Sequence, residues 1–598
     1  MQIKKVRVEN FRCFEKIEVH FDKLTILIGE NNIGKTTMLT AINKVLGFGR
    51  IFFEESDFYK EDENDDPRES EPISIEIELV PSNGSDNFTE NENAVFGYNY
   101  FLKEDGSVSL IIKAQHWFDE EEEEYKTEVN FIKNDEEHGY FAPKYKKTLC
   151  FYLTEAIRDV EREVLSRRGL LPRLLSSISL SENTEDRVAK FSEKINKLIS
   201  TDSAISEFRD DLKKSISNII PLVDSTDSVS LQPIPIDPSD ILKNSGLSLQ
   251  ISGQDMPHPI RIQGAGSQSI LVLSLFESYI KKLGIVAPII GVEEPEAHLH
   301  PHAQRYVFKY LEAKKSQVII STHSTFISDK AEPKSIKLLR RQDDKITVNS
   351  IPSEIKGKPF LTEKEQEKLE RTLNAEGSEL FFARVVILAE GPSEKVAYPF
   401  FAKAINLDFD RHGISVLTYE GDDFHIFGKI FSKQALNIPY VVQPDGEAAT
   451  IKKAVRRLYN LKIIKKSDYT ACKNDTGLFV NNLLIPNNVY PLWKKSKGEG
   501  YNFETYMLSL RGGTNAYLEA ISEIHGKDVL ENYINNRTDL RGKKLTKKIK
   551  IVEFVKSKTA SKPALAQYVV KKYIKDHENS PVPQLFKRVI KKAITLSK

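Results

Sequence analysis

The chain has 598 residues, of which 40% are hydrophobic and 29% are charged, a composition typical of soluble globular proteins. Its length predicts several domains, because a single hydrophobic core rarely serves so long a chain. The 86 basic and 86 acidic residues cancel, which excludes a wholly basic nucleic-acid-binding protein. The three cysteines lie far apart, which excludes a disulfide framework and a cysteine-based zinc site as the organising element.

The N-terminus, MQIKKVRVENFRCF, alternates polar and apolar residues, as a strand does, and it lacks the apolar stretch of a signal peptide. The longest apolar runs, such as 285–292, are far shorter than the roughly 20 residues that span a bilayer. We therefore expect a cytoplasmic protein that makes no membrane contact.

A phosphate-binding loop follows the first buried strand, which we expect over 24–28. The loop reads GENNIGKT, and a helix with regularly spaced apolar residues comes next. This pattern between a strand and a helix predicts backbone N–H groups that surround the phosphates of ATP. We expect Lys35 to reach the β- and γ-phosphates and Thr36 to hold the Mg²⁺ ion that accompanies ATP. The residues expected to contact the nucleotide are Gly29, Asn31, Asn32, Gly34, Lys35, Thr36 and Thr37.

Apolar residues recur at spacings of three and four between 155 and 245, without sustained heptads. This spacing predicts a compact helical insertion rather than a long coiled coil. Such an insertion would most simply hold two protomers together, so we expect a homodimer or a higher homo-oligomer. A bundle without a role in assembly is the alternative.

Downstream, residues 264–268 (GAGSQ) precede an apolar helix and predict a second anion site at a helix N-terminus. This segment cannot serve the same γ-phosphate from the same side as the first loop. Ser267 is therefore expected to complete a nucleotide site on a second protomer, with a simple helix cap as the alternative.

Two acids end the next buried strand, which we expect over 286–292. Glu293 is predicted to hold Mg²⁺, and Glu294 to act as the general base that polarises the attacking water. Another strand, expected over 318–320, leads to His323. We expect this histidine to hydrogen-bond to the γ-phosphate or to the attacking water.

After a polar linker, which we place at 351–378, acids again follow apolar strands. The strand expected over 381–388 precedes Glu390, and the strand expected over 439–442 precedes Asp445 and Glu447. Ligands of open α/β sheets bind at this edge, and carboxylate oxygens are the ligands that Mg²⁺ or Mn²⁺ prefers. A divalent metal site is therefore predicted, with solvated strand-end acids as the alternative.

The last segment, 541–598, contains 17 Lys or Arg and 3 Asp or Glu, a net charge of +14. Its basic residues alternate with apolar ones, which is typical of folded amphipathic helices. A basic face on one domain indicates a phosphate-backbone partner, and we expect DNA to bind there. An ordinary lysine-rich helix surface is the alternative.

The first half of the chain resembles the ABC-type ATPases of the SMC and RecF kind, on its GENNIGKT loop, its EEPE strand end and its ENFR strand. The second half resembles a Toprim domain, on Glu390-Gly391 and on Asp445-x-Glu447. The order of the two resembles the overcoming lysogenization defect (OLD) family of nucleases.

The resemblance implies an α/β protein: an N-terminal ABC-type ATPase (1–154 and 246–350), a helical dimerisation insertion (155–245) and a C-terminal Toprim domain with basic helices (379–598). It implies a metal-dependent DNA endonuclease with ATP as a regulator and a role in antiphage defence. If the protein is Gabija-like, it also implies a UvrD-like helicase partner.

In that family the Toprim site holds two metal ions. The ligands that the resemblance implies here are Glu390, Glu394, Asp445, Glu447 and Glu504, with Lys562 assisting the chemistry. Two positions depart from the family pattern: Glu447 replaces an aspartate, and Asn502 stands where an acid is often found.

Three other classes of protein stay open. An SMC-like DNA-binding ATPase with a degenerate, non-catalytic Toprim domain is favoured by the departures at Glu447 and Asn502, and a nicking assay with Mg²⁺ or Mn²⁺ tests it. A topoisomerase would need a tyrosine nucleophile, and none of the 22 tyrosines has a recognisable context. A primase would usually carry a zinc module, for which the sequence offers no candidate.

Overall fold

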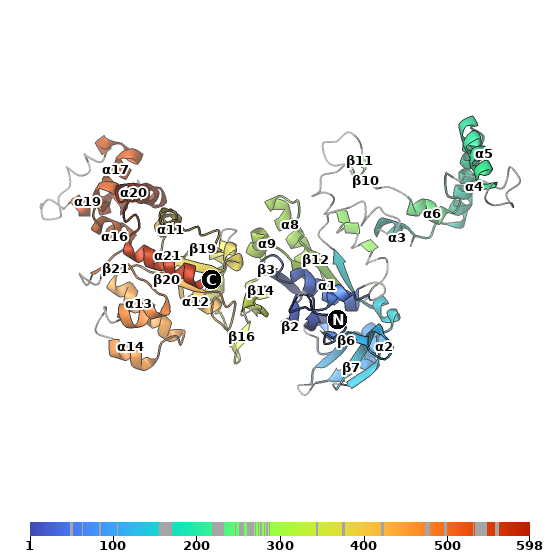
Figure 1. The fold of residues 1–598 in the computed structure, drawn as a ribbon, viewed down its shortest axis with the longest axis horizontal. Helices are drawn as coiled ribbons and strands as arrows, with labels where there is room; N and C mark the ends of the chain where they lie inside the picture. Colours follow the sequence, from blue (N-terminus) through green and yellow to red (C-terminus); the bar gives the residue numbers. More distant parts are fainter. Residues whose placement is uncertain are drawn as a thin grey trace. The chain divides into compact units, whose positions relative to one another are not determined.

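The computed structural model describes residues 1–47, 52–154, 170–217, 233–249, 287–529, 547–556 and 561–597, with short gaps inside these ranges, and isolated positions elsewhere (Figure 1). The chain divides into two units, which are described separately. The first contains Met1–Thr25 and Thr36–Thr322, and the second contains Ile26–Lys35 and His323–Lys598.

An antiparallel seven-stranded sheet opens the first unit, in the order β2-β1-β4-β6-β7-β8 with β5 paired to β6. Its first strand alternates buried apolar residues with more exposed polar ones, as the sequence predicts. The strands are β1 (Gln2–Phe11), β2 (Phe14–His20), β4 (Ile73–Val80), β5 (Phe101–Leu102), β6 (Val108–Asp119), β7 (Glu124–Lys133) and β8 (Glu136–Tyr140).

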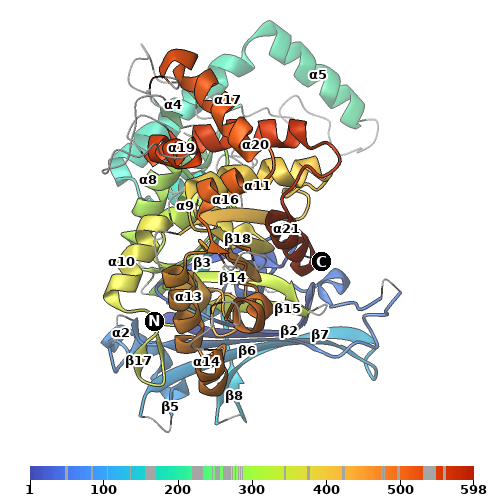
Figure 2. The same ribbon diagram turned by 90° about the vertical axis from the view of Figure 1, so that its left-hand side faces the viewer.

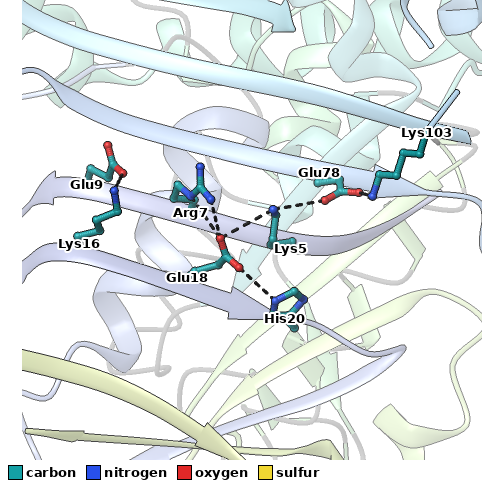
Figure 3. A network of polar contacts seen from close by, with 8 residues as sticks. All are labelled: Lys5, Arg7, Glu9, Lys16, Glu18, His20, Glu78 and Lys103. Carbon is teal, nitrogen blue, oxygen red and sulfur yellow. Dashed lines mark hydrogen bonds and ion pairs between the residues drawn. The ribbon is translucent and has the colours of Figure 1, made fainter. Parts of the chain in front are cut away.

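The polar side chains of this sheet form a network across β2, β1 and β4, with Lys103 joining from outside these strands (Figure 3). Glu18 lies at its centre: Arg7 binds it at 2.9 Å, and His20 at 3.2 Å. Lys5 lies 3.8 Å from Glu18 and from Glu78, so it joins the two acids. Each pair is partly exposed, so each contributes little to stability.

The first unit also contains three parallel strands, in the order β13-β12-β9. They are β9 (Leu149–Thr154), β12 (Ala287–Glu293) and β13 (Gln317–Ser321), and nearly all of their residues are buried, as in sheets covered on both faces. The strands predicted over 286–292 and 318–320 are thus present within a residue or two. Helices α1 (Lys35–Leu46), α2 (Glu90–Phe96) and α8 (Pro301–Glu312) complete this part.

Within the predicted helical insertion, the described residues form α3 (Leu170–Ser176), α4 (Glu182–Ser200), α5 (Ser203–Ser217) and α6 (Pro238–Lys243). Much of the rest of 155–245 lies outside the described residues. The role of this segment in dimerisation stays a prediction.

In the second unit, β3 (Leu24–Gly29) runs parallel to β14 (Ile336–Gln342), which pairs in turn with β15 (Lys345–Ser350). The stretch predicted as a linker contains the short strands β16 (Glu354–Ile355) and β17 (Lys358–Pro359), followed by α10 (Glu363–Thr372). Glu365 on α10 accepts a hydrogen bond of 2.6 Å from Lys429 on α12 (Phe424–Ile430), so this stretch is tied to the domain that follows.

The C-terminal domain is built on three parallel strands, with β18 (Val385–Ala389) between β19 (Ile414–Thr418) and β20 (Tyr440–Gln443). A shared apolar core joins the strands to helices that Figure 2 shows gathered above and beside them. These helices are α11 (Pro392–Ala404), α16 (Phe503–Ser509), α17 (Gly513–His525), α19 (Lys547–Lys556), α20 (Lys562–Asp576) and α21 (Gln584–Leu596).

Two further helices, α13 (Ala448–Asn460) and α14 (Lys466–Cys472), lie side by side in both views (Figures 1 and 2). In the part of the chain that the structure describes, every helix is too short or too polar to cross a membrane.

Asp57 is a buried acid that joins three segments of the first unit. Its side chain is 1% exposed and binds Arg12 at 2.8 Å and Lys44 at 2.7 Å. Burial favours the protonated form, but hydrogen bonds from Lys44, the Glu54 amide and Arg12 prevail and lower the pKa of Asp57. The stabilisation is therefore present above the unfolded-state pKa of about 3.9 and is lost as the pH falls through the folded-state value.

We predict that Asp57→Ala lowers the free energy of unfolding by about 3 kcal/mol, because it leaves two cations beside a buried void. The exposed acid Glu18 also binds several cations, and Glu18→Gln should cost less than about 1 kcal/mol. Thermal denaturation of both variants at neutral pH tests this difference. Equal losses would show that Asp57 has no special structural role.

Candidate nucleotide and metal sites

The loop after β3 has the backbone of a phosphate-binding turn. Gly29 and Gly34 have positive φ angles of 152° and 101°, and Asn32 has a φ of 59°. A Cβ atom at Gly29 would lie 2.5 Å from the Leu339 carbonyl oxygen on β14, so only glycine fits there. The loop leads directly into α1, whose N-terminus favours an anion.

Lys35 bends back over this loop. Its ammonium donates hydrogen bonds to the backbone carbonyls of Gly29 at 3.0 Å and of Glu30 at 2.8 Å. A nucleotide phosphate would compete for this cation. Asn31 and Asn32 are exposed, and Thr37 is half-buried and accepts a hydrogen bond from Cys13 at 3.5 Å.

The two predicted ligands of the nucleotide's Mg²⁺ are in contact, although 257 positions separate them in sequence. The Thr36 hydroxyl donates a hydrogen bond to the Glu293 carboxylate at the end of β12. A hydroxyl beside a carboxylate is a donor set that fits Mg²⁺. The contact is compatible with the predicted roles of Thr36 and Glu293 at the Mg²⁺ of the nucleotide, which stay predictions.

Glu294 has an unusual backbone, with a φ of 44° that non-glycine residues rarely adopt. Its amide donates to the Ser321 carbonyl at 2.9 Å, which ties the residue to the end of β13. Nearby, Thr322 donates to Glu296 at 2.6 Å. Backbone strain of this kind gathers at functional sites, which supports a role for Glu294 beyond packing.

His323 comes two residues after β13, and its ring stacks on Phe382 with centroids 6.4 Å apart. Ser267 lies outside the described residues, and so do the neighbouring glycines of its motif. Its predicted role in a second protomer's nucleotide site stays a prediction.

In the C-terminal domain, acids gather where β18 and β20 end. Glu390 directly follows β18, and Asp445 comes two residues after β20. The Asp445 amide donates to the Glu390 carboxylate at 2.6 Å. The predicted meeting of these loops at one sheet edge is thus present.

Two more predicted ligands stand at helix starts beside them. Glu394 lies in the first turn of α11 and is 4% exposed, and Glu504 lies in the first turn of α16. The Ser393 hydroxyl donates to Glu504 at 3.4 Å, which links the two helices. Burial raises the pKa of Glu394 well above its usual range, and the charges of Asp445, Glu504 and Glu390 raise it further.

The same electrostatic group surrounds Asp445. Burial and the charges of Glu390, Glu504 and Glu447 raise its pKa to about 8, while the cation of Lys562 acts in the opposite direction. Three of the other predicted ligands and the predicted lysine thus influence this one side chain. Glu447 itself is exposed at the start of α13.

Gly446, between these two acids, fixes the loop. Its amide donates to the Tyr501 carbonyl at 2.8 Å. A Cβ atom at Gly446 would lie 2.0 Å from the Leu492 carbonyl oxygen, so a larger residue would push the loop away. This close backbone packing holds Asp445 and Glu447 at the edge of the sheet.

The two remaining positions of interest are both at helix N-termini. Asn502 caps α16, and its side chain accepts a hydrogen bond from the Thr505 amide at 2.9 Å. This cap accounts for a short polar residue at this position, but it does not explain an amide in place of an acid, because Asn and Asp cap helices equally well. Lys562 is the first residue of α20 and is exposed. The N-terminus of a helix is an unfavourable position for a cation. Helix stability therefore does not explain Lys562.

Sequence reasoning missed the polar groups behind the acids. Gln443 and Tyr398 are fully buried and interact with each other, while burial and the charge of Glu394 raise the pKa of Tyr398 well above its usual range. In the sequence, the glutamine at the end of the apolar strand over 440–443 was the signal that could have indicated a buried polar group there.

Mg²⁺ or Mn²⁺ fits this set in chemistry and charge. The donors are carboxylate oxygens, and burial together with their mutual repulsion raises the pKa of Asp445 and Glu394, an unfavourable arrangement that a cation would relieve. Among the described residues, no three potential ligands already surround a single point. Side-chain movements would have to complete the coordination of a bound ion.

Comparison with known proteins gives two family matches in chain order. Residues 1–328 match the AAA ATPase domain family, and residues 381–446 match the TOPRIM domain of overcoming lysogenization defect protein-like proteins. The OLD nuclease of Thermus scotoductus is 26% identical over 464 residues, which cover 74% of this chain and 82% of that protein. Endonuclease GajA of Bacillus cereus is 21% identical over 476 residues, which cover 77% of each chain. The solved C-terminal region of the Burkholderia pseudomallei OLD protein is 17% identical and covers 36% of this chain and all of its own, with a TM-score of 0.27.

We predict that the affinity for Mn²⁺ rises with pH. Below a pKa of about 8, Asp445 carries a proton that the metal must displace. For one displaced proton the affinity should rise by up to about tenfold per pH unit and level off above that pKa. Calorimetry in buffers of different ionisation enthalpy measures both the affinity and the proton release.

Asp445→Asn should bind Mn²⁺ weakly, with a shallower dependence on pH than the wild-type protein, because the proton on Asp445 is no longer displaced. The exposed Asp410 offers a matched control, and Asp410→Asn should keep the wild-type profile. A wild-type affinity that does not change between pH 6 and pH 8 would contradict the assignment of Asp445.

Proposed function

Because the chain belongs to the AAA ATPase domain family and carries a Toprim domain of the overcoming lysogenization defect type, we propose that it is an ATP-binding, metal-dependent DNA endonuclease. Relatives that match about three quarters of its length are named as nucleases. The observation that carries the proposal is the contact of the Glu390 and Asp445 loops, beside the buried Glu394.

The chemistry follows from this arrangement. Two divalent ions, when bound, would supply a metal-activated water and stabilise the leaving oxygen of a phosphodiester. Glu390, Glu394, Asp445, Glu447 and Glu504 would hold these ions. Ser393 would orient Glu504 through its hydrogen bond. Lys562 would bind the phosphate oxygens and offset their negative charge.

The ATPase part would bind ATP with one Mg²⁺. Thr36 and Glu293 would hold this ion, and their contact supports the pairing. Lys35 would bind the phosphates, and Glu294 would accept the proton of the attacking water, with His323 hydrogen-bonded to the γ-phosphate or that water. Ser267 of a second protomer would complete the site in a homo-oligomer.

A role in antiphage defence, a cytoplasmic location and a UvrD-like helicase partner stay predictions. The second candidate function is an SMC-like DNA-binding ATPase with a non-catalytic Toprim domain. It is favoured by the helix-capping role of Asn502 and by the absence of a ready-made three-ligand group among the described residues.

The proposal predicts that Asp445→Asn and Glu390→Gln each lose at least roughly 100-fold in DNA cleavage, since changes even outside the ligand set typically cost 10–100-fold. ATP binding and DNA binding should persist. Plasmid cleavage with Mg²⁺ or Mn²⁺ is the measurement. Glu578→Gln, an exposed acid after α20, is the control and should cleave normally.

Glu447→Asp separates the two candidate functions further. A site adapted to the longer side chain should lose activity on this change, whereas a degenerate site should gain activity or stay inactive. Wild-type cleavage by Asp445→Asn would remove the Toprim site from the mechanism.

Regulation by ATP is supported by a link inside the second unit. Arg384, the residue before β18, binds Glu30 in the phosphate loop through Nε at 2.7 Å and a terminal nitrogen at 3.2 Å. Arg340 on β14 donates to the carbonyls of Ala383 and Arg384 at 3.0 and 3.1 Å. The Glu30 carbonyl also accepts from Lys35, which a nucleotide would attract. A change at the phosphate loop can thus reach β18, the strand that directly precedes Glu390.

Arg384→Gln is therefore expected to reduce the effect of ATP on cleavage, whichever direction that effect has. Cleavage without ATP and the affinity for ATP should stay close to wild type, because the Glu30 pair is half-exposed and contributes little to stability. Cleavage rates with and without ATP measure the coupling.

Arg411→Gln, at an exposed arginine, serves as the matched control and should keep the full effect of ATP. Lys35→Ala should abolish both ATP binding and the effect. An unchanged response to ATP in Arg384→Gln would exclude this route of regulation.

A further inference from the structure

A strongly basic segment begins at the proposed metal site. Residues 448–467 contain seven Lys or Arg and no Asp or Glu. They form α13 and the turn into α14, and α13 starts immediately after Glu447. The C-terminal tail is the more obvious basic region, because the acidic neighbours of residues 448–467 mask this segment in the overall charge.

The basic residues of α13 share one face. Lys452, Lys453 and Arg456 are exposed, and Arg457 is half-buried beside them. The opposite face supplies the core, with Ile451, Ala454, Val455 and Leu458 all buried. Packing therefore fixes the helix through its apolar side, and the fold does not require cations on the other side.

The basic surface continues beyond the helix. Lys462, Lys465 and Lys466 are exposed in the turn and at the start of α14. Tyr459 on α13 stacks on Tyr469 of α14 with ring centroids 5.6 Å apart, which holds the two helices together. The surface is thus formed before any ligand binds.

We infer that the basic face of α13, with Lys462, Lys465 and Lys466, binds the phosphate backbone of double-stranded DNA and leads it to the acids at Asp445 and Glu447. Lys452 and Arg456 lie roughly 8 and 14 Å along the axis from Glu447, at about 1.5 Å per residue. The helix is about 20 Å long, and a duplex of that length carries about 12 phosphate charges. This inference rests on the proposed function and names the surface that would hold its substrate.

The C-terminal helices are a weaker candidate for the same role. On α20, Lys572 is already paired with Glu519 at 2.8 Å and with Asp576 at 3.2 Å. Residues 541–546, which contain three of the tail's 17 basic residues, lie outside the described residues. Charge alone favoured the tail, whereas position relative to the acids favours α13.

The test compares two variants with the same spacing and exposure. Lys452→Gln/Arg456→Gln removes two cations from α13, and Lys571→Gln/Lys575→Gln removes two exposed cations from α20. Binding of a short fluorescent duplex is followed in EDTA, where no metal supports cleavage, at several salt concentrations. For the α13 variant we expect about tenfold weaker binding and a salt slope smaller by about two. The α20 variant should change little.

Three further readouts keep the outcome interpretable. The α13 variant should retain the wild-type affinity for Mn²⁺, and its cleavage should recover at saturating DNA. Wild-type DNA affinity in the α13 variant, or an equal loss in the α20 variant, would overturn this inference and leave the nuclease proposal intact. Tighter wild-type binding to duplex RNA than to duplex DNA would also overturn it. If the wild-type protein binds no nucleic acid, the proposed function itself fails.

Discussion

The main constraint on the second unit is the mutual repulsion among acids that the backbone brings to one edge of a three-stranded sheet. Glu394 is buried and Asp445 half-buried beside other carboxylates, and burial and these acids raise the pKa of both, an effect that Lys562 offsets only in part at Asp445. A fold that needed only stability would replace such residues. The repulsion is tolerated because the loop cannot move away: Gly446 packs against the Leu492 carbonyl with no room for a side chain. A divalent cation would turn this unfavourable group into a favourable one.

Much of this arrangement could be predicted from the sequence, because it depends on local patterns. The phosphate loop lies between a strand and a helix as expected, and Thr36 meets Glu293 across 257 positions because parallel strands place their carboxyl ends together. The Glu390 and Asp445 loops meet for the same reason. In each case the residue follows the end of a parallel strand, and it therefore lies at the carboxyl edge of the sheet.

The remainder depends on contacts that no local pattern encodes. Nothing in the sequence near Ser393 indicates that its hydroxyl binds Glu504, 111 positions away. The link from Arg384 to Glu30 spans 354 positions and exists only once β14 brings the phosphate loop beside the start of β18. The capping role of Asn502 is local, but an N-cap and a metal ligand call for the same kind of short polar residue, so the sequence does not separate them.

The overall charge is a further property from which the surface of the protein could not be predicted. A net charge of zero conceals a segment of seven cations without an acid, because the charges of a chain say nothing about which of them share a surface. On α13 the apolar residues determine which side faces the core, so the cations must share the solvent side. Helix α13 starts directly after Glu447. A DNA duplex held by the cations of α13 would therefore run towards carboxylates that repel its phosphates. Only a bound divalent ion would make that path continuous, so metal binding and DNA positioning would act together in this domain.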